Sequence, residues 1–116
     1  MHLDFFSGRD PLLERADAER VMKRKLPKAK NSGHRLDVFA EAAFYGVPLG
    51  QMETAKSLLG RTSPRIQNDL RQYVVEAAES GIPAAQMLLA ECYERGVLFP
   101  KNPILAQHLR QMAEKS

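Results

Sequence analysis

Apolar residues recur along most of this chain at the spacing of one helix face. In residues 64–80, for example, Ile66, Leu70, Val74 and Ala78 follow one another at intervals of four. This spacing predicts an amphipathic α-helix that buries one side. No segment alternates apolar and polar residues for long enough to predict a strand. The pattern therefore predicts an all-α protein.

Proline, glycine and capping residues predict where the helices begin and end. Proline suits the first helical turn, and glycine suits the position just after a helix. Gly46 and Gly81 each precede a proline by two residues, so each should end one helix shortly before the next begins. Asp10, Asn31 or Ser32, and Asn102 are the predicted polar caps. The predicted helices span residues 11–26, 32–46, 48–59, 64–80, 83–95 and 103–115.

Two segments of the chain repeat each other. Residues 40–61 read AEAAFYGVPLGQMETAKSLLGR, and residues 75–96 read VEAAESGIPAAQMLLAECYERG, an offset of 35 residues. A fixed period of this length is typical of arrays of helical hairpins. Short loops make successive helices antiparallel neighbours. We therefore predict a short right-handed α/α solenoid of six helices in three antiparallel hairpins.

The length of 116 residues suits a single domain. We expect an N-terminal lead at residues 1–9 and one helical-repeat domain at 10–116. Within that domain, a degenerate hairpin at 10–46 precedes repeats at 47–81 and 82–116. The last helix should present a polar outer face, as a terminal repeat requires, and bury Leu105, Ala106, Leu109, Met112 and Ala113.

Small and aromatic residues stand at fixed positions in the second copy and the helix after it: Ala85, Leu89, Ala90, Tyr93, Gly96, Asn102, Ala106 and Ala113. This pattern resembles the Sel-one-like repeat family, a relative of the tetratricopeptide repeat, with Ala90 for the usual glycine and Asn102 for the usual aspartate. In the first copy, Thr54 replaces the usual leucine and Arg61 the usual glycine. The resemblance implies a helical-hairpin fold and an adaptor or scaffold role, and it indicates no particular partner.

A helical wheel of residues 83–95 separates a packing arc from an opposite arc that is a candidate for partner binding. In related helical repeats, this opposite arc of the first helix in each hairpin lines the concave surface. Methionine repeats on it, and methionine is a flexible, polarisable residue suited to adaptable binding surfaces. The alternative is that these methionines belong to the core. The predicted partner-binding residues are Leu49, Met52, Lys56, Leu59, Ala84, Met87, Glu91 and Glu94.

Basic residues gather between Arg20 and Arg35, where seven cations occur with no acidic residue. The net charge of the chain is +3, and its pI is about 9.2. The cluster could contact phosphates, or it could be a solvated helix end where cations favour the helix dipole. No aromatic residue interleaves with it, which weakens a single-strand-binding role. The candidate contacts to an anionic partner are Lys23, Arg24, Lys25 and Lys28.

Residues that carry catalysis or bind metals are not grouped in this sequence. The three histidines lie in distant segments, and none has a histidine or cysteine three or four residues away, so we expect no metal site. Cys92, the one cysteine, lies on the packing arc and is expected to be a small buried hydrophobe. We therefore expect no catalytic residue, no cofactor and no enzymatic activity.

Several bulk features suggest a soluble, cytoplasmic protein. No apolar run approaches the roughly 18 residues of a membrane span, residues 1–10 lack the features of a secretory signal, and a single cysteine fits a reducing compartment. We expect a non-enzymatic module that binds a protein or peptide on its concave face. The alternatives are nucleic-acid association through the basic cluster and self-association through Leu3, Phe5 and Phe6.

Overall fold

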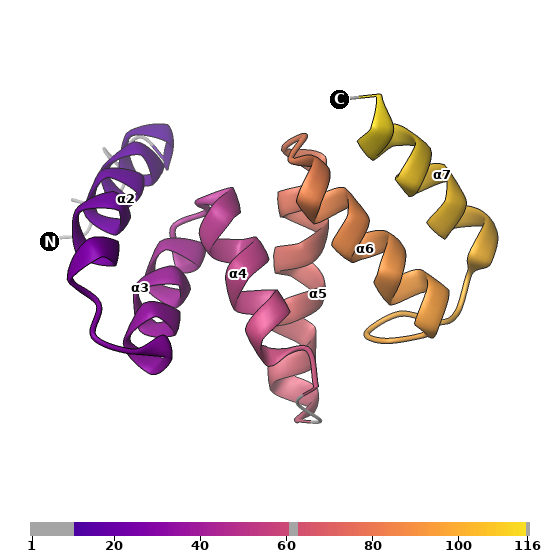
Figure 1. Cartoon of the computed structure of the whole chain (residues 1–116), viewed down its shortest axis with the longest axis horizontal. Helices are drawn as coiled ribbons and strands as arrows, with labels where there is room; N and C mark the ends of the chain where they lie inside the picture. The colour runs from indigo at the N-terminus through magenta and orange to yellow at the C-terminus, as the bar shows by residue number, and fades with distance from the viewer. Residues whose placement is uncertain (1–10, 61–62, 116) are drawn as a thin grey trace, which may run out of the picture.

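The computed structural model describes residues 11–60 and 63–115, and all regular structure in these ranges is helical (Figure 1). The six α-helices confirm the all-α prediction, whereas the expected contacts of Leu3, Phe5 and Phe6 and the Asp10 cap lie outside the described residues. A short 3-10 turn, η1 (Leu26–Lys28), follows the first described helix. The helices are α2 (Pro11–Lys25), α3 (Ser32–Phe44), α4 (Pro48–Leu58), α5 (Pro64–Glu79), α6 (Pro83–Arg95) and α7 (Pro103–Glu114).

The helix boundaries follow local signals in the sequence. Five of the helices, all except α3, begin with a proline, whose missing N–H has no intrahelical partner at that position. The side chains of Asn31 and Asn102 accept a hydrogen bond from the backbone N–H three residues later, at 2.8 and 3.1 Å. Gly46 and Gly81 adopt φ angles of 85° and 93°, which glycine tolerates best. The chain therefore reverses within a few residues at both positions.

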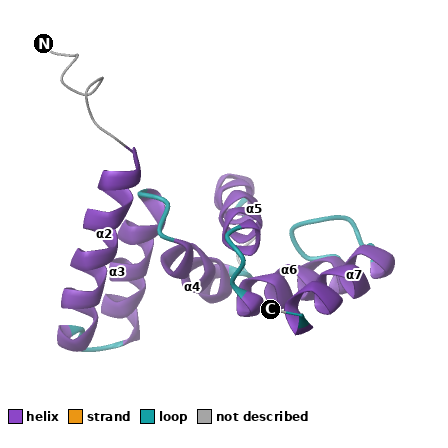
Figure 2. Ribbon diagram, turned by 90° about the horizontal axis from the view of Figure 1, so that it is seen from above, coloured by secondary structure: helices purple, strands orange, loops and turns teal. Residues whose placement is uncertain are grey.

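The helices follow one another as antiparallel neighbours along the longest axis of the molecule (Figures 1 and 2). Each helix packs on the next in the sequence, and α4 also contacts α6, the first helix of the following hairpin. The principal extents are 48 × 33 × 31 Å. This all-α, solenoid-like arrangement matches the predicted architecture, and its right-handed sense stays a prediction.

Two hydrophobic clusters stabilise the stack. The larger cluster joins α4, α5, α6 and α7 and includes Leu70, Val74 and Ala85, each at most 1% exposed. The smaller cluster joins α2, α3 and the start of α4 around Met22 and Phe39. The first hairpin therefore has its own small core, and the other two share one.

Close approach of α3 and α4 depends on Gly50. A Cβ atom at this position would lie 2.7 Å from the Phe39 carbonyl oxygen and 2.9 Å from the Ala42 Cβ. These distances are below van der Waals contact, so the two helix backbones leave no room for a side chain here. The residue at the same place in the second copy is Ala85, which is fully buried.

The loop between α6 and α7 is attached to α5 by Arg71. The Arg71 Nη1 donates a hydrogen bond to the Leu98 carbonyl oxygen at 3.1 Å. Leu98 has a φ of 67°, a left-handed conformation that leucine rarely adopts. The Tyr93 and Phe99 rings stack with centroids 4.8 Å apart. These contacts hold the loop of the last hairpin against the core.

Helix α2 has a mostly charged surface among its described side chains, residues 14–25. Met22 is its one buried residue in that range, at 2% exposed. The apolar positions of this segment are interrupted by charged residues in the sequence. The exposed residues are Arg15, Asp17, Glu19, Arg20, Lys23, Arg24 and Lys25.

Helix α7 departs from the predicted burial. Ala106 and Leu109 are buried as expected, but Met112 is 42% exposed, and Leu105 and Ala113 are only half-buried. The prediction that Met112 belongs to the core is therefore wrong. The physical reason is that α7 packs mainly on α6, whereas α5 packs on α4 and α6 on its two sides.

Candidate protein-interaction surface

The predicted partner-binding arc is open to solvent on α6. Ala84, Met87 and Glu94 are exposed and Glu91 is half-buried, whereas six other residues of this helix are buried. Met87 is 39% exposed, which makes it one of the exposed large hydrophobic residues of the described chain. The arc therefore forms a narrow stripe with an apolar, flexible side chain near its middle.

On α4 the same arc is only partly accessible. Leu49 and Lys56 are exposed, and Leu59, which follows the helix, is half-buried. Met52 is 6% exposed and belongs to the core cluster shared with α5 and α6. The assignment of Met52 to the partner-binding surface is therefore wrong, because the neighbouring helices cover it.

Ion pairs flank the exposed stripe of α6. The Glu91 carboxylate binds Arg95 Nη1 at 2.7 Å within the helix. The Glu94 carboxylate binds Arg110 Nη2 of α7, also at 2.7 Å. The acidic residues of the stripe are thus largely neutralised by arginines of the same hairpin.

The basic cluster is exposed, but part of its charge is neutralised. Lys23 Nζ lies 3.4 Å from Glu19, and Lys25 Nζ lies 3.1 Å from Glu41 on α3. Arg24 and Lys28 are exposed and face solvent. The cluster therefore offers less free positive charge than its sequence suggests, which weakens the nucleic-acid alternative.

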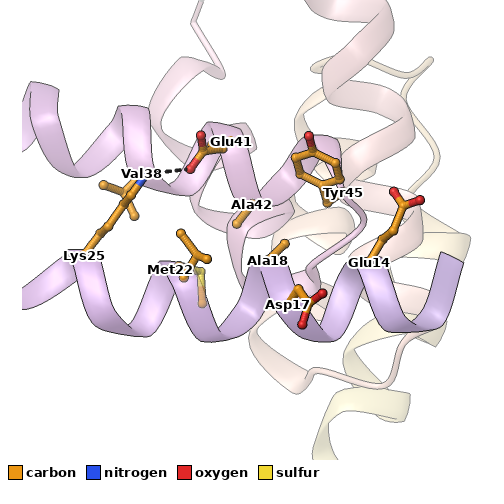
Figure 3. A pocket seen from close by; sticks show the side chains of 10 residues that line it. Glu14, Asp17, Ala18, Met22, Lys25, Val38, Glu41, Ala42 and Tyr45 are labelled. Carbon is orange, nitrogen blue, oxygen red and sulfur yellow. Dashed lines mark hydrogen bonds and ion pairs between the residues drawn. The ribbon is translucent and has the colours of Figure 1, made fainter. Parts of the chain in front are cut away.

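A groove between α2 and α3 is a feature that the sequence analysis missed (Figure 3). It is an open depression of about 260 Å³. The Lys25–Glu41 ion pair joins the two helices at its edge. The groove could have been predicted from Ala18, Met22 and Ala42. Small and apolar residues at helical spacing on both segments imply that the two helices pack through a shared face. The lining residues are Glu14, Asp17, Ala18, Val21, Met22, Lys25, Val38, Glu41, Ala42 and Tyr45.

Reactive chemistry is not assembled in the described ranges. Residues 11–60 and 63–115 contain no group of three His, Cys, Asp or Glu side chains that could hold a metal ion. Cys92 is fully buried, and this burial raises the pKa of its thiol to about 11. A protonated, inaccessible thiol is a poor nucleophile. Among the described helices, none is long and apolar enough to cross a membrane.

Comparison with known proteins identifies the fold. No family model and no curated protein matches the sequence. The structure is similar to the crystal structure of a Sel1 repeat protein from Oxalobacter formigenes, with a TM-score of 0.65 and 18% sequence identity. The match covers 99% of this chain and 97% of that protein. The similarity of fold therefore extends over the described helices from α2 to α7.

Proposed function

Since the chain has the fold of a Sel1 repeat protein, we propose that it is a non-enzymatic interaction module that binds another protein or a peptide. We also propose that residues 10–116 act as one domain of three hairpins. The observation that carries the functional proposal is the exposed stripe on α6. There, Met87 is 39% exposed although six other residues of the same helix are buried.

The stripe has the physical properties that favour protein binding. Burying apolar surface contributes about 25 cal/mol per Å², and a methionine can adjust its shape to a partner. The flanking carboxylates of Glu91 and Glu94 already have arginine partners in the hairpin, so a partner need not supply opposite charges. Side chains held in ion pairs also lose less conformational freedom on binding. The remaining residues of the proposed surface are Leu49, Lys56, Leu59 and Ala84.

Substitution of Met87 by glutamate tests this proposal. The change places a charge in the stripe without disturbing the core, so helical content and melting temperature should stay unchanged. Capture of partner proteins from the native cell should be lost. Ser57→Glu is the matched control, because Ser57 is exposed on α4 outside the predicted arc and the substitution adds the same charge.

Two results would contradict the proposal. Capture that is equally strong for Met87→Glu and Ser57→Glu would show that the stripe does not bind the partner. Loss of folding in the Met87→Glu variant would show that Met87 supports the core.

The non-enzymatic part of the proposal is supported by the state of the one cysteine. Cys92 is buried and its thiol has a raised pKa, so it is suited to packing. The nucleic-acid alternative has less support, since Lys23 and Lys25 lie within reach of Glu19 and Glu41. A basic cluster of this kind is expected to give weak, strongly salt-dependent retention on heparin.

A further inference from the structure

Residues at equivalent places in successive hairpins differ sharply in exposure. Met52 of α4 is 6% exposed, whereas Met87, 35 residues later on α6, is 39% exposed. Ala77 of α5 is 0% exposed, whereas Met112, 35 residues later on α7, is 42% exposed. The half-buried Ala113 lies beside Met112 on the same helix. We refer to Met87, Met112 and Ala113 as the end face.

The preceding hairpin indicates how the residues of the end face are arranged in the last hairpin. In the preceding hairpin, Gln51 Nε2 donates to Glu76 Oε1 at 2.7 Å. Met52 follows Gln51 on α4, and Ala77 follows Glu76 on α5. Met52 and Ala77 therefore lie at the same level of their hairpin. Met87 and Met112 lie 35 residues after Met52 and Ala77, so they occupy the equivalent positions in the hairpin of α6 and α7.

Inside the chain, this kind of surface is covered by a following first helix. Helix α4 packs on α3 with Gly50 against Ala42, at a distance that excludes a side chain on Gly50. Helix α6 packs on α5 in the next hairpin, with Ala85 fully buried and Gln86 Nε2 donating to the Ala78 carbonyl oxygen at 3.4 Å. Within residues 11–60 and 63–115, no corresponding helix follows α7.

We infer that the end face binds one amphipathic α-helix of a partner protein, in the place that a following first helix would occupy. This inference rests on the proposed interaction function and assigns it a surface and a partner. The two internal interfaces indicate what kind of helix would bind here. In both, the helix that packs on the preceding hairpin, α4 or α6, starts with a proline and carries a small residue two positions later. The bound helix therefore has a small residue near its start and apolar residues on the same face.

The end face differs from the internal interfaces in one respect that favours an exchangeable ligand. The place of Ala42 and Ala77 is taken by Met112, which is larger and more flexible. A helix that docks here meets a deformable side chain instead of a fixed alanine surface, and a small residue at the contact leaves room for the larger methionine. A flexible methionine also suits a reversible contact.

The probe for this inference is a peptide of residues 46–60, which contains α4. A lactam between Glu53 and a lysine at position 57 keeps the peptide helical, because isolated helices of this length are marginal. The full chain carries ¹³C-labelled methionine methyl groups. We expect saturable NMR shifts of the Met87 and Met112 methyls, with the buried Met22 and Met52 methyls unchanged.

The matched control is the same stapled peptide with Gly50→Leu. Leucine is a better helix former than glycine, so any loss of binding reports close approach and not helix content. We expect its dissociation constant to rise at least about tenfold. The chain variant with Met87→Glu and Met112→Glu should show no methyl or amide shifts with either peptide.

Each other outcome would overturn the inference. One such outcome is that the methyl signals do not shift at about 1 mM of a peptide shown to be helical by circular dichroism. Others are that the Gly50→Leu peptide binds equally well, or that the methyl signals of Met22 and Met52 shift. Light scattering that shows a dimer dissociated by Met87→Glu would assign the end face to a second copy. If Met87→Glu loses the natural partner but the peptide does not bind, the proposed function stands and only the helix-docking inference fails.

Discussion

Replacing Gly50 with alanine should destabilise the chain, although alanine favours helices. An ideal Cβ at this position would lie 2.7 Å from the Phe39 carbonyl oxygen, and 2.9 Å from both the Ala42 Cβ and the Ala43 backbone nitrogen. Two of these three atoms are backbone, so α3 and α4 must move apart. Overpacking of this kind costs about 1–3 kcal/mol, and the gain in helix propensity offsets about 1 kcal/mol.

The expected net loss is therefore up to about 2 kcal/mol, or up to roughly 10 °C in melting temperature for a domain of this size. Thermal and urea unfolding followed by circular dichroism measure this change. Gly60→Ala is the control, because nothing lies within 4 Å of its added Cβ, and it should be neutral or slightly stabilising. An equal or higher melting temperature for Gly50→Ala than for Gly60→Ala would refute the steric argument.

Three further predictions follow from burial and hydrogen bonding. Met52→Glu should unfold the chain or lower its stability by about 3 kcal/mol or more, because it buries an unpaired charge, whereas Met87→Glu should change urea stability by less than about 0.5 kcal/mol. Burial raises the pKa of the Cys92 thiol from 9.0 to about 11. The contribution of this thiol to stability is therefore intact below pH ~9 and is lost as the pH rises through ~11. Over this pH window, the urea midpoint of the Cys92→Ala variant should fall less than that of the unchanged chain. Arg71→Met removes the hydrogen bond to the Leu98 carbonyl, and hydrogen exchange of the loop after α6 should become faster while that of α3 stays unchanged.

Helix positions could be predicted well because their signals are local. The bounds of α6 were predicted to the residue, since a proline begins it and Gly96 ends it in the left-handed conformation. Asn102 caps α7 as predicted, and of the two candidates for the cap of α3, Asn31 or Ser32, the cap is Asn31. The turn η1 was not anticipated, because its three residues carry no repeating pattern.

The binding surface could be predicted only in part. Met52 and Met87 follow a glutamine in both copies of the repeat, yet one is buried and the other exposed. Their difference arises from which helices surround α4 and α6, and no residue near either methionine encodes that. The same limit applies to Met112, whose helical spacing predicted a core position although it is 42% exposed.

The two ends of the described stack are chemically unlike, and this affects how copies could assemble. A contact between the end face of one copy and α2 of the next would be heterologous, and an open contact of that kind can propagate into a filament. It would take Arg20 and Lys23, at 72% and 69% side-chain exposure, and their ion-pair partners Asp17 and Glu19 out of water against uncharged methionines. The charged surface of α2 therefore disfavours a contact of this kind with the end face.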